Sequence, residues 1–312
     1  MSVDLEHELM RLHDDGAAVD RGHRGAVLVT GRDGLSFLQA LVSADVDALA
    51  DGEGTHCLLL TPQGKLDVDV RLLRVGDDAW LDCEPGLGAR LAASLQKFRI
   101  RVQADIVDRS DEQRTVSLVG PLAVARFEER TGVQVPAALH AHVAWGDVRV
   151  VRADWGGVAG VDLLGPAPVA PEGFAEVGPV VFEAFRIERG VPRQPLDLDD
   201  ATIPQEAFLE RDAVSFTKGC FLGQELVCRI DSRGHVNRFL RRFGSIDGAW
   251  PTPGAEVVAD GKVVGTLTSV APAELPTGAL GYVRREVDPP AQVELRWEHG
   301  TARAVVEELA VS

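Results

Sequence analysis

The stretch from Leu66 to Leu72 alternates strictly between aliphatic and charged residues, and this pattern constrains the fold more than any other feature of the sequence. A period of two is that of a β-strand, because successive side chains of a strand point to opposite faces. One face is therefore buried in an apolar core, while the other carries Asp67, Asp69 and Arg71. We interpret this charged face first as an exposed strand face, and keep a ligand-binding role for its carboxylates as the alternative.

The residues around this strand predict a compact α+β unit centred on residues 55–107. An apolar strand at 56–60 precedes Leu66, and the turn-forming sequence Thr61–Lys65 joins the two strands. The remaining predicted elements are a strand at 79–83, a helix with apolar residues at helical spacing from Leu87 to Phe98, and a strand at 102–107. The unit is thus expected to be a small sheet covered by a helix.

A second α+β unit, centred on 114–190, is predicted from a similar order of elements. Its predicted elements are a strand at 115–119, a helix at 121–130, strands at 142–153 and 158–164, and a short helix at 179–189 that ends at Gly190. From Phe239 onward, short strands and tight turns such as Asp260-Gly261 and His299-Gly300 predict a small antiparallel barrel or sandwich. We therefore divide the chain into an α+β region, residues 1–237, and a C-terminal β unit, residues 238–312.

The acidic character of the chain restricts its partners. It has 32 basic and 48 acidic residues and a net charge of −16, which repels nucleic-acid phosphates and anionic membranes. Its local basic run consists of Arg229, Arg233, Arg238, Arg241 and Arg242. That run is compatible with a small anionic ligand, whereas the total charge argues against direct binding of nucleic acid.

Neither the N-terminus nor the cysteines point to a secreted or membrane protein. No stretch approaches the ~20 apolar residues of a membrane span, and Met1–Val19 lacks the basic start and apolar run of a signal peptide. Four cysteines in 312 residues, none of them in a C-x-x-C pair, make neither a disulfide framework nor a metal motif. We expect a cytoplasmic protein with reduced thiols and no metal site of its own.

The segment Lys218–Glu225, with the sequence KGCFLGQE, carries the strongest functional signal. Its two glycines indicate backbone conformations or close approaches that a side chain would block. Apolar residues at i, i+4 and i+8 from Leu222 predict a helix, so that Cys220 lies at or just before a helix N-terminus, beside Lys218. A helix dipole and a nearby ammonium both favour a thiolate. We therefore predict Cys220 as the reactive group, and we interpret the other three cysteines as small buried apolar residues.

A second candidate, Glu188, lies near the end of the predicted helix within Phe185–Pro192. A carboxylate there could accept two hydrogen bonds from an amino-pyrimidine ring. The alternative interpretation is a solvated charge at the end of a helix.

Together, Phe185–Pro192, Ile203–Glu206 and Lys218–Glu225 resemble the YgfZ family of folate-binding proteins. The hallmark of that family is the motif K-G-C-[FY]-x-G-Q-E, which residues 218–225 match at every fixed position. Weaker similarity covers nearly the whole chain. Thr30–Asp33 and Leu60–Gly64 look like the start of the broader group that includes the glycine-cleavage aminomethyltransferases.

The resemblance implies a fold, a ligand and a role. The fold would be a three-part clover of the GcvT and YgfZ type, in which two interleaved α+β lobes and a C-terminal antiparallel β-barrel surround a central channel. A tetrahydrofolate derivative would bind in that channel. The role would be support for the assembly or repair of iron–sulfur enzymes, including radical enzymes that modify transfer RNA. The implied partners are iron–sulfur assembly proteins and client enzymes.

The resemblance also assigns residues. Cys220 is the residue most tied to function, with Lys218 beside it. The residues placed around the folate or in the motif loop are Glu188, Asp67, Asp69, Gln224, Glu225 and Arg229, of which Glu188 would contact the ring and Arg229 the tail. One cysteine cannot supply the four protein ligands common for iron–sulfur clusters, so any cluster would be transient and shared with a partner.

Two other functions remain open. A folate-dependent aminomethyltransferase, or a related one-carbon transferase, is the main alternative. Aminomethyltransferases carry adjacent aspartates where Val68 here separates Asp67 from Asp69. Because neighbouring residues of a strand face opposite ways, this insertion weakens that alternative. Direct binding of transfer RNA has only the basic run in its favour.

Overall fold

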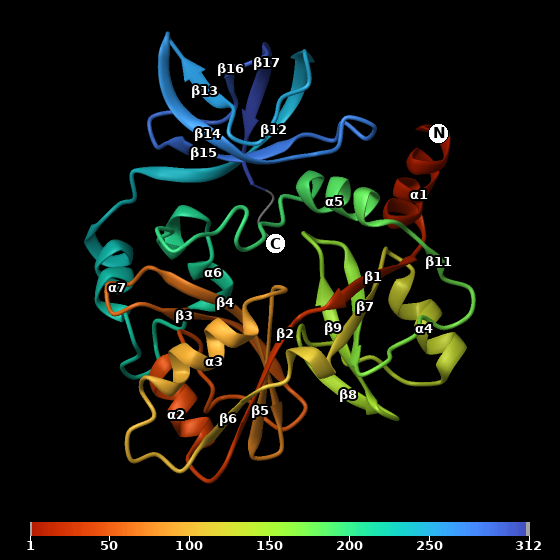
Figure 1. Cartoon of the computed structure of the whole chain (residues 1–312), viewed down its shortest axis with the longest axis vertical. Helices are drawn as coiled ribbons and strands as arrows, with labels where there is room; N and C mark the ends of the chain where they lie inside the picture. Colours follow the sequence, from red (N-terminus) through yellow and green to blue (C-terminus); the bar gives the residue numbers. More distant parts are fainter. Residues whose placement is uncertain (1, 310–312) are drawn as a thin grey trace.

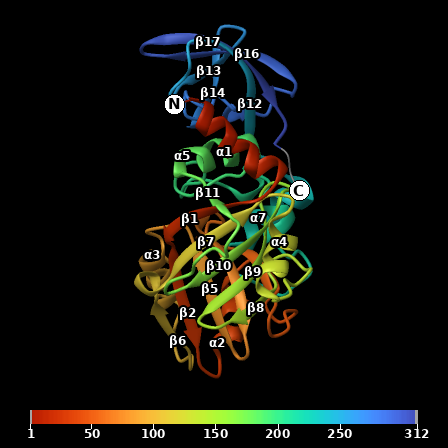
Figure 2. The same cartoon turned by 90° about the vertical axis from the view of Figure 1, so that its right-hand side faces the viewer.

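Three β-sheets organise the chain in the computed structural model, which describes residues 2–309. Two α+β lobes lie side by side, and a six-stranded barrel stands above them (Figure 1). Helices α1 (Ser2–Asp14) and α5 (Pro179–Glu188) lie between the barrel and the lobes (Figure 2). No helix within residues 2–309 is long and apolar enough to cross a membrane.

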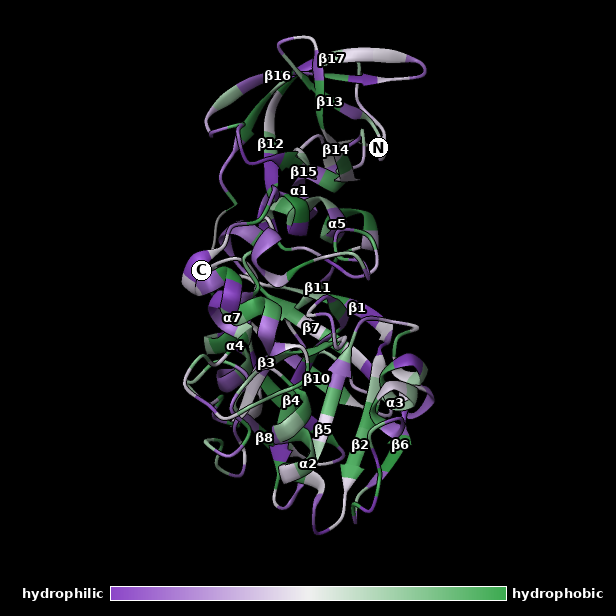
Figure 3. Cartoon of the chain, turned by 90° about the vertical axis from the view of Figure 1, so that its left-hand side faces the viewer, coloured by the Kyte–Doolittle hydropathy of each residue, from purple (hydrophilic) through white to green (hydrophobic). Residues whose placement is uncertain are grey.

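The first lobe contains the alternating strand from which the sequence analysis started. Its sheet has the order β3 (Gly54–Leu60), β4 (Leu66–Val75), β5 (Asp78–Cys83), β2 (Gly25–Thr30) and β6 (Asp105–Asp108), all antiparallel. Val68, Val70 and Leu72 of β4 are at most 1% exposed and pack in one core with residues of α2 (Gly34–Leu41) and α3 (Gly88–Gln96). Hydrophobic β2 marks this core in Figure 3. The predicted strands and helix of this unit are confirmed.

The second lobe follows the predicted element order with one difference. Its sheet has the order β11 (Ala175–Glu176), β1 (Ala17–His23), β7 (Arg114–Val119), β10 (Ala159–Gly165), β9 (Val148–Asp154) and β8 (His142–Trp145), and α4 (Ala123–Thr131) packs on it. The single strand predicted at 142–153 is wrong. It is a hairpin, because Gly146 adopts a positive φ of 60° and turns the chain back at Asp147.

The two lobes are interleaved, and the first crossover between them takes a single residue. Strand β1 joins the sheet of the second lobe, whereas β2 joins that of the first, and only Arg24 separates them. The charged residues near this crossover therefore lie at the junction of the lobes. The turn η1 (Ser110–Glu112) connects β6 back to β7, so the chain passes between the lobes twice.

The C-terminal strands form a closed antiparallel barrel. Its order is β12 (Arg238–Gly248), β15 (Ala279–Arg284), β14 (Lys262–Val270), β13 (Glu256–Ala259), β16 (Ala291–Trp297) and β17 (Gly300–Glu307). The Asp260-Gly261 hairpin is confirmed, with positive φ at both residues as a type I′ turn requires. The turn predicted at His299-Gly300 lies one residue earlier, since Glu298 and His299 are the two turn residues between β16 and β17.

The segment between α5 and the barrel contains the turn η2 (Pro204–Glu206) and helices α6 (Glu210–Ala213) and α7 (Gln224–Arg233). Gly190 ends the α5 region with a φ of 71°, as predicted. The helix predicted from Leu222 begins only at Gln224. Gly223 precedes it with a φ of 78°, and this left-handed conformation separates Leu222 from the helix.

Candidate functional site

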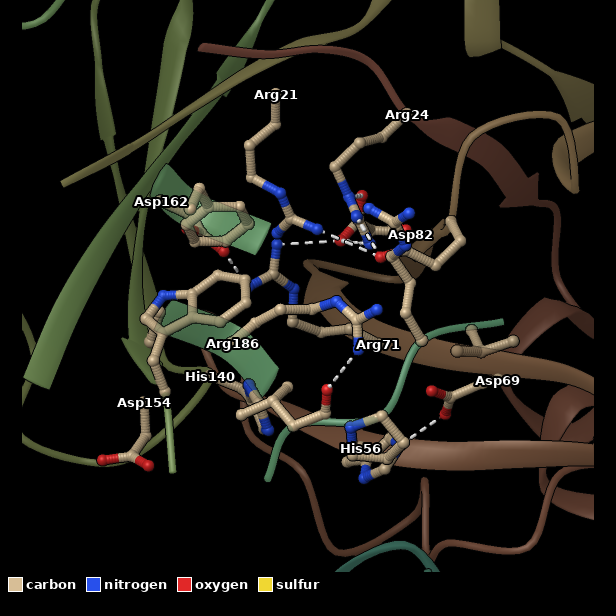
Figure 4. A pocket seen from close by; sticks show the side chains of 18 residues that line it. Arg21, Arg24, His56, Asp69, Arg71, Asp82, His140, Asp154, Asp162 and Arg186 are labelled. Atoms are coloured by element: carbon tan, nitrogen blue, oxygen red, sulfur yellow. Dashed lines mark hydrogen bonds and ion pairs between the residues drawn. The ribbon is translucent and has the colours of Figure 1, made fainter. Parts of the chain in front are cut away.

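Arg71 connects the two lobes through buried ion pairs. From β4 of the first lobe, its guanidinium donates to Asp82 at 2.8 Å and to Asp162, on β10 of the second lobe, at 2.6 Å. Ser117 donates a further hydrogen bond of 2.7 Å to Asp162. Figure 4 shows Arg71, Asp82 and Asp162 converging between the two sheets. The charged face of β4 is therefore the inner wall of the lobe junction, and our first interpretation of it as an exposed strand face is wrong.

Arg24 continues this network from the crossover between β1 and β2. It donates to Asp82 at 3.0 Å and to Glu84, and Arg21 adds an ion pair of 3.0 Å to Glu84. Burial alone would raise the pKa of Asp82, but the guanidinium groups of Arg24 and Arg71 outweigh it and hold that pKa below its usual value. The carboxylates of the junction are thus kept ionised by the arginines that cross it.

Two adjoining cavities open beside this network. The smaller, about 160 Å³, is lined by the arginine and aspartate cluster, and the larger, about 820 Å³, lies between the lobes and the segment that precedes the barrel. Six residues line both cavities: His56, Asp69, His140, Asp154, Val191 and Pro192. We call the two together the central cavity. Concave sites of about 300–1,000 Å³ hold small-molecule ligands in most proteins.

Asp69 and His56 form the titratable pair of the central cavity. The carboxylate of Asp69, on β4, pairs with Nε2 of His56, on β3. Burial opposes the charged form of His56, but the Asp69 carboxylate outweighs it, so the pKa of this imidazole is raised. Gln194 holds the strand in place, because its amide accepts from the Asp69 backbone N–H and donates to the Asp67 carbonyl, both at 3.0 Å.

His140 lines both cavities together with this pair, but its protonation state differs from that of His56. Burial, with the nearby charges of Arg71 and His56, lowers the pKa of His140 to about 3, so its imidazole is neutral. Three side chains that line the smaller cavity carry buried nitrogen atoms without a hydrogen-bond partner within residues 2–309: His140 Nδ1, Arg71 Nε and Trp155 Nε1. Buried polar groups are normally paired, so these atoms are suited to hold a polar ligand.

The Lys218–Glu225 loop lies outside the central cavity. Lys218 donates from Nζ to three backbone carbonyls, those of Gln39, Val42 and Ala44, at 2.6–2.8 Å. These carbonyls belong to the C-terminal end of α2 and the residues after it, where helix carbonyls lack partners. We predicted that the ammonium of Lys218 favours the Cys220 thiolate. The structure instead gives this ammonium an anchoring role, because its three donors are occupied.

Gly223 of the loop permits a close approach to the β3–β4 turn, whereas a Cβ at Gly219 would meet no atom within 4 Å, so the prediction for the two glycines holds for Gly223 alone. Gly64 has a φ of 76°, and a Cβ there would lie 2.6 Å from the Cβ of Leu226 and 2.8 Å from the carbonyl oxygen of Gly223. The side chain of Gln224 accepts a hydrogen bond of 3.1 Å from the backbone N–H of Phe221. Cys220 itself is exposed. The motif therefore builds a fixed loop that presents one thiol to solvent.

The other predicted site residues are dispersed. Asp67 pairs with Arg90 of α3 at 2.7 Å, and Glu188 pairs with His13 of α1 at 3.1 Å. Glu225 and Arg229 are exposed on α7. Of the predicted folate contacts, Asp69 alone is among the residues that line the two cavities.

The other three cysteines were predicted to be buried, and two of them are. Cys57 and Cys83 are at most 1% exposed, and burial raises their pKa. Cys228 is half-buried on α7. Among the described residues, no group of three or more His, Cys, Asp or Glu side chains is arranged to hold a metal.

Most of the cavity wall was missed by the sequence analysis. The missed residues are Arg21, Arg24, His56, Asp82, His140, Asp162 and Arg186. Asp162 gave a signal, since it is a lone acid in the apolar run Val158–Leu164, and a charge in a buried strand needs a partner. Arg186 is 1% exposed, and it pairs with Asp197 at 2.8 Å and with Glu183.

The comparisons with known proteins agree with this architecture. The family model for the GCVT N-terminal domain matches residues 1–218. The crystal structure of the glycine cleavage system aminomethyltransferase T from Bartonella henselae superposes with a TM-score of 0.83 over 98% of this chain and 89% of that one, at 19% identity. This superposition confirms the predicted GcvT-like fold.

Two relatives represent two functions. An aminomethyltransferase from Lysinibacillus sphaericus is 28% identical over 297 residues, covering 86% of this chain and 77% of that protein. A mitochondrial iron–sulfur cluster assembly factor, the IBA57 homologue of Mycosarcoma maydis, is 30% identical over 232 residues, covering 69% of this chain and 54% of that protein. Since the family model covers more than two thirds of its length, the chain belongs to the family defined by the GCVT N-terminal domain.

Proposed function

We propose that this protein binds a tetrahydrofolate in its central cavity and supports the assembly or repair of iron–sulfur enzymes through Cys220, as a member of the YgfZ and IBA57 branch of its family. The observation that carries the proposal is the loop of Cys220. Its backbone is fixed by Lys218, while its thiol is exposed. A loop held this way suits contact with another macromolecule rather than chemistry on a buried ligand.

The central cavity fits a reduced folate in size and in chemistry. Its larger part measures about 820 Å³ and has apolar walls at Val191, Pro192 and Leu209, against which a flat ring packs. Asp69 supplies a carboxylate that accepts hydrogen bonds from ring N–H groups, and His140 has an unpaired Nδ1. When bound, the folate would supply a carrier for one-carbon units. The residues of the chain would bind and orient it.

The iron–sulfur role draws on the KGCFLGQE motif and on the relative named as an iron–sulfur cluster assembly factor. A single thiol cannot hold a cluster with the usual four ligands. Cys220 therefore acts together with ligands of an assembly protein or a client enzyme, and radical enzymes that modify transfer RNA are the clients that the motif suggests.

The test is genetic complementation. A strain that lacks the gene receives wild-type protein, Cys220→Ser or the control Cys228→Ser, whose half-buried cysteine lies on α7. We expect wild type and Cys228→Ser to restore a radical enzyme that contains a 4Fe–4S cluster, and Cys220→Ser to fail although it accumulates as folded protein. Equal rescue by all three would remove Cys220 from the mechanism. Failure of wild-type protein would remove the iron–sulfur role.

A one-carbon transferase is the second candidate, and the Asp69–His56 pair inside the cavity favours it. Its test is turnover of a lipoyl-bound aminomethyl donor in the presence of tetrahydrofolate, with wild type compared with Asp69→Asn. Turnover that is lost in the variant supports the transferase. Absence of turnover in wild type excludes this donor chemistry.

A further inference from the structure

We propose that Arg211 and Arg241, arranged around the ring of Phe208, form a second subsite at the mouth of the central cavity, which binds the γ-linked glutamate tail of a polyglutamylated folate. This inference rests on the proposed binding of folate. It replaces the tail contact that the sequence analysis assigned to Arg229. The subsite draws on two separate parts of the chain, α6 with the residues before it and strand β12 of the barrel.

The aromatic residue at the centre of this subsite, Phe208, has an unusual backbone conformation. Phe208 has a φ of 59°, a left-handed conformation that bulky side chains rarely adopt and that clusters at functional sites. Its ring stacks on that of Phe239, with centroids 5.4 Å apart and an interplanar angle of 8°. Phe208 also lines the larger part of the central cavity. The strained residue thus joins the barrel to the cavity wall.

Two arginines lie against the ring of Phe208. The guanidinium carbon of Arg211 is 4.6 Å from the ring centroid of Phe208. That of Arg241 is 5.1 Å from the same centroid and 4.9 Å from that of Phe239. Stacking on a ring leaves the N–H groups at the edge of the guanidinium free to bind an anion.

These two arginines differ from their neighbours in lacking a carboxylate partner. On the same strand β12, Arg238 pairs with Glu206 at 3.0 Å and Arg242 pairs with Glu307. Neither Arg211 nor Arg241 forms an ion pair within residues 2–309, and Nε of Arg241 is buried without a hydrogen-bond partner. In a chain with 48 acidic residues, two adjacent unpaired arginines are available for an external anion.

The position of the arginines matches a tail that leaves the cavity. Arg211 lines the larger part of the cavity together with Arg152, which reaches it from β9 of the second lobe. Asp154 and Asp212 also line it, so the wall as a whole is not uniformly basic. Of the two arginines that line this part, Arg211 shares the Phe208 ring with a further arginine, so we place the tail along Arg211 toward Arg241 and the barrel.

The ligand class follows from the chemistry. Arginine recognises carboxylates through paired N–H groups. A folate with one glutamate carries two carboxylates at the end of its tail, and each added γ-linked glutamate carries one more. A subsite built on these two arginines would therefore distinguish long tails from short ones.

The experiment measures how affinity depends on tail length. The dissociation constants of 5-formyltetrahydrofolate with one and with five glutamates are determined by calorimetry for wild type, Arg211→Gln, Arg241→Gln and the control Arg229→Gln. We expect the pentaglutamate to bind wild type at least about tenfold more tightly than the monoglutamate, and each cavity-mouth variant to lose most of that ratio. The affinity for the monoglutamate should stay within about twofold in Arg241→Gln, because Arg241 does not line the cavity, and Arg229→Gln should resemble wild type.

Each outcome separates this inference from the proposed function. Equal binding of both ligands to wild type overturns the tail subsite and leaves folate binding intact. A loss confined to Arg229→Gln places the tail over α7 and also overturns it. No binding of either ligand contradicts the proposed function itself. If Arg241→Gln fails to fold, Arg211→Gln decides the question, because Arg211 is exposed.

Discussion

The central cavity and the Cys220 loop are both built around cationic side chains, but these cations have different uses. In the cavity wall, Arg71 and Arg24 bind carboxylates from two lobes. In the loop, Lys218 binds backbone carbonyls at the end of α2. The first arrangement keeps several charges inside the protein, whereas the second uses one charge to fix a stretch of backbone.

This difference shows how many residues of the motif serve to hold the backbone of the loop in place. Within KGCFLGQE, the side chains of Lys218 and Gln224 bind backbone groups, and Gly223 permits a close approach to the β3–β4 turn. Cys220 has no such role in the loop, and it is exposed. In the cavity, by contrast, the charged side chains that cross the junction are themselves the wall of the cavity. Substitutions should therefore affect the two regions very differently.

The largest effect on stability is expected in the cavity wall. Asp82→Asn removes a buried charge that both Arg24 and Arg71 bind, and leaves them with Glu84 and Asp162 as their remaining carboxylate partners. Removing one partner of a buried ion pair costs about 3–5 kcal/mol. Urea unfolding of the variant, beside the exposed control Asp77→Asn, measures this loss. A loss below about 1 kcal/mol would mean that the arginines find solvent or other partners.

The loop should show the next largest effect. Lys218→Met removes three hydrogen bonds from an ammonium and leaves the carbonyls of Gln39, Val42 and Ala44 without this donor. Hydrogen bonds to charged groups contribute about 1.5–3 kcal/mol each but share one desolvation cost, so we expect a loss of about 2–4 kcal/mol. The exposed Lys65→Met is the matched control. Faster proteolysis within residues 214–223 would locate the loss in the loop.

The sequence predicted strands and turns better than the cavity for a physical reason. The alternation of Leu66–Leu72, the turn at Thr61–Lys65 and the hairpin at Asp260-Gly261 are local signals, and the elements that they predict are present. The cavity wall depends on pairs that are distant in sequence, such as Arg71 with Asp162. No local sequence pattern indicates which arginine forms an ion pair with which aspartate, because the pairing depends on how the two lobes interleave at Arg24.

The Asp69–His56 pair should make a smaller contribution to stability, and this contribution depends on pH. The pKa of His56 is raised in the folded state above its ordinary value of 6.5. The pair therefore adds stability that is complete below that value and is lost as the pH rises through the folded-state pKa. Both side chains are about a quarter exposed, so we expect about 1 kcal/mol or less.

The measurement for this pair is the difference in unfolding free energy between wild type and His56→Gln at several pH values. The difference should shrink as the pH rises above 6.5 and through the folded-state pKa, where the imidazole of wild type loses its proton. His235→Gln, which alters an exposed histidine, is the control. A difference that grows with pH would show that the folded state favours the neutral imidazole.

The smallest effect on stability belongs to the residue with the largest proposed role. Cys220 is exposed on a loop whose fixed points lie at Lys218 and Gln224, so Cys220→Ser should change the free energy of unfolding by less than about 0.5 kcal/mol. Cys57→Ser places a hydroxyl in the core of the first lobe, where the native thiol is fully buried, and should cost about 1–3 kcal/mol. Parallel urea titrations of the two variants test this contrast. If Cys220→Ser were the more damaging of the two, the thiol would be part of the construction of the loop, and loss of iron–sulfur activity in that variant would no longer show a direct role for the thiol.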